Sequence, residues 1–206
     1  MVRIVKSAPE RKEEIIKAGC ELFLSKGYEN TTMQDVMAKV QIAKGTIYHY
    51  FKSKEELLAA VISFIVNKDI ERQKHLAAQV SGNALEKMHR LVMNGRNNDE
   101  AEILNNLHHP ANAGMHIRLI AELITRLAPL YAEVIKQGCD EGFFTTQSPL
   151  ECAEFLLAAS QFLTDIGVYP WTQEQLQRRT TALPGLIEAQ LEAPRGSFAF
   201  LLENAV

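Results

Sequence analysis

A short segment near the N-terminus gathers side chains that can hydrogen-bond to nucleic acid. Its sequence is KGTIYHYF, at residues 44–51. A lysine reaches phosphate or guanine, a threonine bonds a base edge or touches a thymine methyl group, and tyrosine hydroxyls donate to phosphate. Gly45 lacks a Cβ, so the backbone there can approach a phosphate closely. Ile47 and Phe51 are four residues apart, which predicts one buried helical face and leaves the other faces to the polar side chains.

Two residues outside this segment extend the same chemistry. Thr32 lies at the predicted start of one helix and Lys54 at the start of another, where free amide groups and the positive dipole end attract phosphate. A second interpretation stays open at this point: Tyr48 and Tyr50 are half-buried structural aromatics and the lysines form a solvated face. Periodicity alone does not separate the two, because a three-helix unit need not bind nucleic acid.

The elements that position these side chains are short helices. Apolar spacing predicts a helix over residues 9–26, with Gly27 as its stop, and a second helix over 33–39. A turn at 40–42 leads into a third helix over 43–50. The second and third helices have the proportions of a helix-turn-helix, in which the later helix lies in the major groove of DNA.

Charge is distributed unevenly along the chain. Residues 1–55 hold 10 Lys and Arg against 7 Asp and Glu, whereas residues 56–206 hold 12 against 18. The modestly basic part coincides with the tyrosine-rich segment. This distribution suits phosphate contact at one end of the chain and argues against a general polyanion binder.

Other classes of function find little support in the sequence. A Gly-rich phosphate loop, HExxH, GxSxG and paired-carboxylate motifs are all missing, so we expect no enzymatic activity. Cys20, Cys139 and Cys152 lack CxxC spacing, which predicts small core residues, and we expect no metal and no cofactor. The N-terminal residues show no signal-peptide pattern, and no apolar run approaches the ~18 residues of a membrane span. We therefore expect a cytoplasmic protein without a membrane partner.

The segment from Ile15 to Leu58, IIKAGCELFLSKGYENTTMQDVMAKVQIAKGTIYHYFKSKEELL, resembles the N-terminal domain of the TetR/AcrR family of bacterial transcriptional regulators. The motifs ELFLSKGYENTT, KGTIYHYF and KSKEEL carry the resemblance. It implies an all-helical homodimer with a three-helix DNA-binding domain and a variable C-terminal domain that holds an effector and releases DNA when occupied. Carried over by position, the implied DNA contacts are Thr32, Lys44, Gly45, Thr46, Tyr48, His49, Tyr50 and Lys54.

The chain departs from the family pattern at two positions beside the recognition helix. Gln41 stands where the family usually has Gly, and a positive φ there would cost about 1 kcal/mol. Ala43 stands where Ser or Thr usually caps the recognition helix, which loses a cap typically worth ~1 kcal/mol. We expect a less rigid or slightly reshaped turn, with the helix-turn-helix retained.

Helical periodicity continues through the rest of the chain. Ser/Thr capping boxes at Ser7, Thr32, Ser53, Ser148 and Thr172 mark helix starts. Further helices are predicted over residues 53–79, 84–93, 100–107, 113–138, 149–166 and 173–191, followed by an irregular tail over 192–206. The expected fold is all-α with about nine helices. It comprises a DNA-binding domain over 1–52 and a ligand-binding and dimerisation domain over 53–206, with the helix that starts at Ser53 as the connector.

The predicted helix over 149–166 is apolar on two sides. Its bulky stripe includes Phe155 and Phe162, and its second stripe of smaller side chains includes Ala153 and Leu157. We expect the bulky stripe to face its own domain and the smaller stripe to face a partner. Together with the last helix, this predicts a homodimer through a four-helix interface.

An effector pocket is expected among the middle helices. The candidate ligand-binding residues are Met88, Met93, Leu104, His116, Leu119, Leu123, Tyr131, Phe155 and Phe162. Such side chains at helical spacing also serve as plain core, and that alternative stays open at each position. His108, His109 and His116 are candidates for polar groups at the pocket mouth, but their spacing is not that of a metal site.

These observations predict a sequence-specific DNA-binding transcriptional regulator. Its partners would be double-stranded DNA with a palindromic operator, a second copy of the chain and a small-molecule effector that releases the repressor. The alternatives are a DNA-binding regulator without an effector and a helical enzyme.

Overall fold

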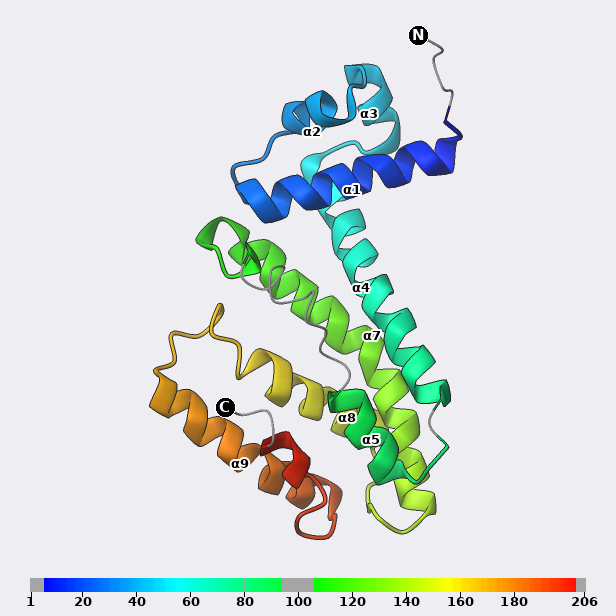
Figure 1. Cartoon of the computed structure of the whole chain (residues 1–206), viewed down its shortest axis with the longest axis vertical. Coiled ribbons are helices and arrows are strands. Elements are labelled where there is room, and N and C mark those ends of the chain that lie inside the picture. Colours follow the sequence, from blue (N-terminus) through cyan, green and yellow to red (C-terminus); the bar gives the residue numbers. More distant parts are fainter. Residues whose placement is uncertain (1–5, 80, 94–105, 203–206) are drawn as a thin grey trace. The chain divides into compact units, whose positions relative to one another are not determined.

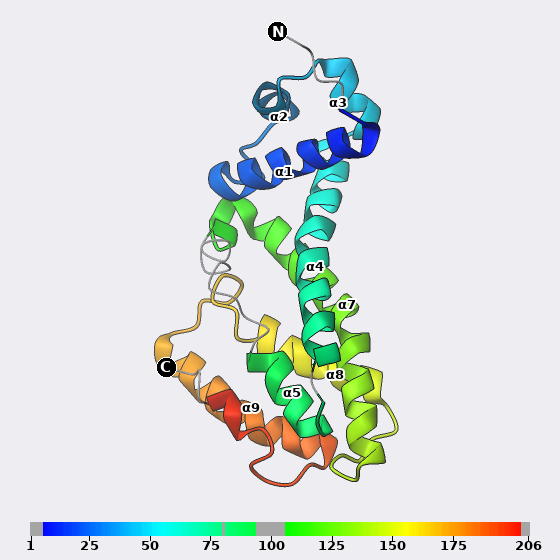
Figure 2. The same ribbon diagram turned by 45° about the vertical axis from the view of Figure 1, so that its right-hand side comes forward.

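The computed structural model describes residues 6–79, 81–93 and 106–202. Those ranges contain eight α-helices and short 3-10 and π segments (Figures 1 and 2). The all-α expectation is therefore confirmed. Within the described ranges no helix is both long and apolar enough to cross a membrane.

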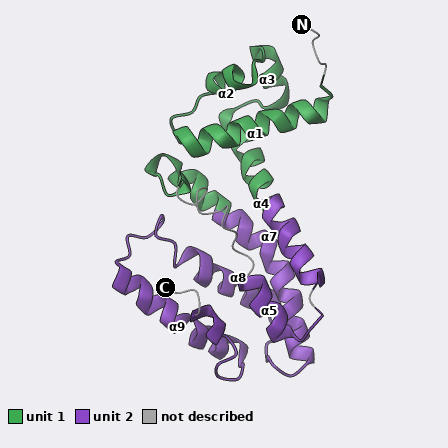
Figure 3. Cartoon of the chain, in the orientation of Figure 1, with its two compact units in different colours: residues 1–66, 102–119 green, residues 67–101, 120–206 purple. Residues whose placement is uncertain are grey.

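The chain divides into two compact units (Figure 3). Unit 1 comprises residues 1–66 and 102–119, and unit 2 comprises residues 67–101 and 120–206. The helices α4 (Lys54–Gln79) and α7 (Ala113–Asp140) each begin in unit 1 and continue into unit 2. The predicted boundary after residue 52 separates a DNA-binding domain from a ligand-binding and dimerisation domain, and it stays a prediction.

Unit 1 contains the three N-terminal helices, α1 (Ala8–Lys26), α2 (Met33–Val40) and α3 (Lys44–Tyr50). Ser7 and Thr32 begin α1 and α2 with capping boxes, in which the side chain accepts from the third amide and a carboxylate bonds back to the cap. The apolar side chains Ile15, Phe23, Val36, Ile47, Phe51 and Leu57 are each at most 2 % exposed and form the core of the unit. Burial of this face fixes which residues of α3 remain outside.

The turn between α2 and α3 contains both residues that depart from the family pattern, and its predicted lower rigidity stays a prediction. Gln41 adopts a left-handed conformation, with φ 56° and ψ 48°. Its amide and the amide of Ile42 both donate to Met37 O, which closes the end of α2. Ala43 stands at the N-cap of α3 without a side-chain hydrogen bond. The turn therefore contains a left-handed residue other than glycine and leads into a helix without a side-chain cap.

The 3-10 turn Pro110–Asn112, which directly precedes α7, packs against the loop after α1, inside unit 1. The Tyr28 amide donates to Asn112 Oδ1 at 2.7 Å, and the Glu29 amide donates to Ala111 O at 3.1 Å. Gly27 has φ 90°, and a Cβ there would lie 2.6 Å from Ala111 Cβ. Glycine is required at this position by both the backbone conformation and the close approach.

Unit 2 is built from the second half of α4, α5 (Ala84–Met93), most of α7, α8 (Pro149–Leu157) and α9 (Gln173–Leu191). The bounds of α5 and α9 agree with the predicted ranges. Pro129 and Pro184 lie inside helices that continue past them. The predicted helix over 100–107 lies almost entirely outside the described residues.

Three predictions about the helix over 149–166 are wrong. The helix that starts at Pro149 ends at Leu157 and passes into a π segment at Ala158–Phe162, and Ser148 makes no side-chain cap. The orientation of that helix is also not as expected: Phe155 of the bulky stripe is 70 % exposed, while the smaller Ala153 and Leu157 are buried. Burial does not follow the two predicted stripes, because Leu156 of the bulky stripe is also buried and Leu150 of the smaller stripe is 42 % exposed.

The predicted irregular tail is folded as far as residue 202. Phe198 and Phe200 are buried, and residues Ala199–Leu202 form a 3-10 turn. The Glu188 carboxylate accepts hydrogen bonds from the amides of Gly196 at 2.9 Å and Phe198 at 3.1 Å, which turns the chain back onto α9. The two phenylalanines make this segment part of the core of unit 2.

Candidate nucleic-acid interface

The third helix presents a polar face over a buried apolar one. Ile47 is 0 % exposed and anchors α3 to the core. Lys44, Gly45 and His49 are exposed, and Thr46, Tyr48 and Tyr50 are half-buried. The structure therefore brings together six of the eight predicted DNA contacts on one short helix.

The side chains on this face are arranged in neighbouring pairs. Lys44 Nζ lies 5.9 Å from the centroid of the Tyr48 ring, and the His49 and Tyr50 rings meet edge to face at 5.1 Å. A Cβ at Gly45 would meet nothing within 4 Å. Packing inside the chain therefore does not explain glycine at that position, whereas close approach of a phosphate would explain it.

Thr32 is held in the capping box of α2. Its hydroxyl donates to Asp35 Oδ2 at 2.7 Å, and Lys26 pairs with the other carboxylate oxygen at 2.9 Å. The hydrogen bonds from Lys26 and then Thr32 hold the pKa of Asp35 well below its usual range. Lys26 therefore offsets the carboxylate charge beside Thr32, at the helix end where a phosphate would approach.

Lys54 is placed differently from the other predicted contacts. Its ammonium donates to Tyr28 O at 2.9 Å and lies 4.3 Å from the centroid of the Tyr28 ring. In the structure this lysine joins the start of α4 to the loop after α1. Lys52 was missed by sequence reasoning, although it is exposed and its Nζ donates to Tyr48 O at 2.9 Å. Its position directly after the segment 44–51, one helical turn after Tyr48, is the signal that could have found it.

The residues predicted to line an effector pocket are dispersed. Met88, His116, Leu119 and Tyr131 are buried core, while Met93, Leu123 and Phe162 are half-buried. Phe155 is exposed, and Leu104 lies outside the described residues. The rings of His108 and His116 are 5.2 Å apart, and His109 caps the 3-10 turn Pro110–Asn112. The groove that unit 2 does contain is lined by none of the nine.

Two family profiles match the chain. Residues 15–61 match the profile described as bacterial regulatory proteins, tetR family, and residues 95–185 match the one described as tetracyclin repressor-like, C-terminal domain. Together they cover more than half of the sequence. The chain belongs to the TetR/AcrR family.

Individual relatives agree with this assignment. The uncharacterized HTH-type transcriptional regulator YerO of Bacillus subtilis is 36 % identical over 73 residues, which is 35 % of this chain and 25 % of that protein. The HTH-type transcriptional repressor KstR2 of Mycobacterium tuberculosis is 22 % identical over 70 % of this chain and 74 % of its own length. The chain thus spans only about a quarter of the first of these relatives.

The fold is shared with solved structures. The crystal structure of a TetR-family transcriptional regulator from Pectobacterium atrosepticum aligns with a TM-score of 0.67 and 20 % identity, covering 92 % of this chain and all of that one. At this identity the likeness concerns the fold alone.

Proposed function

We propose that the protein is a transcriptional regulator that binds double-stranded DNA through α3. The observation that carries this proposal is the composition of the α3 surface: six polar or glycine residues face outward over the buried Ile47 and Phe51. Lysine, threonine and tyrosine match base edges and phosphates, and a helix of this size enters the major groove. The proposal places the protein in the cytoplasm, because the bacterial chromosome lies there.

The same proposal includes a homodimer through α8 and α9. Leu150 and Phe155 of α8, Leu163 and Ile166 after it, and Leu186 of α9 are between 42 % and 70 % exposed. Large apolar side chains gathered on two neighbouring helices are typical of a surface that a partner covers. A two-fold dimer presents two copies of α3, which suits a palindromic operator with half-sites about 34–36 Å or somewhat more apart.

Repression that is relieved by a small molecule completes the proposal. Both α4 and α7 continue from unit 2 into unit 1. There, Lys54 at the start of α4 and Asn112 just before α7 each hydrogen-bond to Tyr28, in the loop between α1 and α2. A ligand that binds unit 2 more tightly in one state of these helices would shift the position of α3 and weaken DNA binding.

Selection from a random duplex library tests the proposal. The purified chain is mixed with the library, bound duplexes are recovered over several rounds, and the enriched sequences are aligned. We expect a palindrome with two half-sites about one helical turn or more apart. Enrichment of no sequence would contradict the regulator function, and turnover of a substrate by the same preparation would favour an enzyme.

A further inference from the structure

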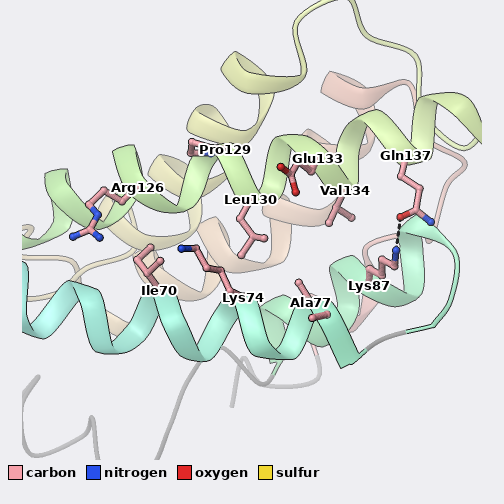
Figure 4. A pocket seen from close by; sticks show the side chains of 11 residues that line it. Ile70, Lys74, Ala77, Lys87, Arg126, Pro129, Leu130, Glu133, Val134 and Gln137 are labelled. Carbon is pink, nitrogen blue, oxygen red and sulfur yellow. Dashed lines mark hydrogen bonds between the residues drawn. The ribbon is translucent and has the colours of Figure 1, made fainter.

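Unit 2 contains a groove of about 550 Å³ between the second half of α4, α5 and α7 (Figure 4). It is open to solvent along one side. Its lining includes the small residues Ala77 and Ala78 of α4 and, from α7, Pro129 and Leu130. The volume lies in the range of small-molecule sites and is too small for a folded partner.

The lining of the groove combines apolar walls with positive charge. Ile70, Leu130 and Val134 provide apolar surface, and Lys74, Lys87 and Arg126 provide three cations against the single carboxylate of Glu133. Figure 4 shows the Lys74 ammonium between α4 and α7. The groove therefore favours a ligand that has an apolar body and a negative charge, and disfavours a cationic ligand.

The side chain of Lys87 is positioned by the neutral side chain of Gln137. Its Nζ donates to Gln137 Oε1 at 2.7 Å. Gln137 Nε2 in turn donates to Gly82 O at 3.1 Å and to Glu141 Oε1 at 2.6 Å. Glu141 Oε2 also accepts a hydrogen bond of 2.8 Å from the Ala84 amide at the start of α5. The amide thus fixes the position of Lys87 without neutralising its charge directly.

The other two cations have partners at the margins of the groove. Lys74 pairs with Glu71 at 3.1 Å, and both side chains are more than half exposed. Arg126 is shared between Asn67, at 2.6 Å, and Glu122, at 3.3 Å. Exposed pairs of this kind are weak in water, so an anion that is partly desolvated on the apolar walls can compete for the lysine.

We infer that this groove binds a small organic anion with an apolar body. This ligand class is that of the effector of the regulator proposed above. The role of the ligand as an effector rests on that proposed function, whereas its binding to the groove does not. The anionic group lies among the lysines, where charge-assisted hydrogen bonds are the strong ones, and the body covers Ile70, Leu130 and Val134.

Two probes with the same aromatic body test the inference on the full-length chain without DNA. Anilinonaphthalene sulfonate is anionic, and phenylnaphthylamine is the same body without the sulfonate. Fluorescence titrations compare the Lys74→Met, Lys87→Met double variant with a Lys68→Met, Lys136→Met double variant. The second pair removes the same charge from exposed positions of α4 and α7 that do not line the groove.

We expect the groove variant to bind the sulfonate about tenfold more weakly and the control within about twofold of the unchanged chain. Decanoate should displace the sulfonate, and neither substitution should alter binding of the neutral probe. Equal losses in the two double variants, no loss in either, or no displacement by decanoate would overturn the inference. Thermal unfolding of each variant checks that it is folded. These results are independent of operator selection, so a failure of one proposal is distinguishable from a failure of the other.

Discussion

The hydroxyl of Tyr28 donates a hydrogen bond of 2.6 Å to the carboxylate of Glu55. Arg118, near the start of α7, donates to the same carboxylate. One side chain of α4 is thereby joined to the loop after α1 and to α7, all within unit 1. Both α4 and α7 continue into unit 2.

The Tyr28–Glu55 pair predicts a specific alkaline transition. Burial, and then the hydrogen bond to Glu55, raise the pKa of Tyr28 to about 12, from an ordinary value of about 10. A group whose pKa is raised by folding contributes stability that is complete below its unfolded pKa and is lost as pH rises from about 10 towards 12. Absorbance titration should show a late ionisation step, and Tyr28→Phe should remove one tyrosine from that step. Tyr50→Phe is the control, and a late step of unchanged amplitude in Tyr28→Phe would refute the assignment.

Low pH should weaken the same contact, because it protonates the Glu55 carboxylate. The hydrogen bonds from Tyr28 and then Arg118 lower the pKa of Glu55. A lowered carboxyl pKa gives stability that is present above the unfolded value of about 4.3 and is lost as pH falls further. Glu55→Gln should therefore unfold with a shallower acid dependence than the unchanged chain in urea titrations across this range. Identical dependence in the two proteins would argue that the carboxylate is solvated.

Gln41→Gly should stabilise the protein. Gln41 has φ 56°, a conformation that costs an ordinary residue about 1 kcal/mol more than glycine. Part of this gain is offset by the greater freedom of glycine in the unfolded chain, so we expect about 0.5 kcal/mol in urea unfolding. Gln34→Gly, in the first turn of α2, should instead destabilise by up to about 1 kcal/mol. The prediction fails if both substitutions destabilise equally.

Gln73→Met should also stabilise the protein. Gln73 is 2 % exposed, and its Oε1 has no hydrogen-bond partner among the described residues. Removing an unsatisfied buried acceptor while keeping the side-chain volume should gain about 1 kcal/mol. Gln137→Met is the matched contrast, because Gln137 makes three hydrogen bonds and its loss should cost about 1 kcal/mol or more. Chemical unfolding measures both, and a loss of stability in Gln73→Met would show that its amide is bound.

Phe155→Glu should give monomers. Phe155 is 70 % exposed in the single chain, the highest value among the large apolar residues of the described α8 and α9. A carboxylate there would have to be buried unpaired in a dimer, at a cost of several kcal/mol. Sedimentation velocity should show a halved mass, while Ile117→Glu, an exposed apolar position of unit 1, should leave the mass unchanged. A dimer that survives Phe155→Glu would place the interface elsewhere.

Local sequence rules predicted the DNA-binding helices well. The alternation of Ile47 and Phe51 with polar residues fixes the orientation of α3, and the residue types at 41 and 43 anticipated the left-handed turn and the missing cap. These features depend on neighbours within a few residues, so periodicity and capping chemistry suffice. Lys54 is different, because its partner Tyr28 is 26 positions away.

Long-range packing limited the prediction of the C-terminal part. Both stripes of α8 are apolar, so composition could not tell that Phe155 faces outward and Leu157 inward. Phe198 and Phe200 followed Pro194 and Gly196, which indicated a loop, and only their burial on unit 2 makes them core. The groove escaped prediction because lysines and alanines line it, and such residues usually mark a solvated face.

Binding of the selected operator by variants of α3 tests the central claim most directly. Fluorescence anisotropy would compare Lys44→Ala and Tyr48→Phe with Lys136→Ala, an exposed lysine of α7. We predict at least about fivefold weaker binding for each α3 variant. If Lys44 contacts phosphate, the slope of log K against log salt concentration should also be smaller in magnitude by about one for Lys44→Ala. Lys136→Ala should bind as the unchanged chain does. Unchanged affinity in both α3 variants, with the fold intact, would contradict the account.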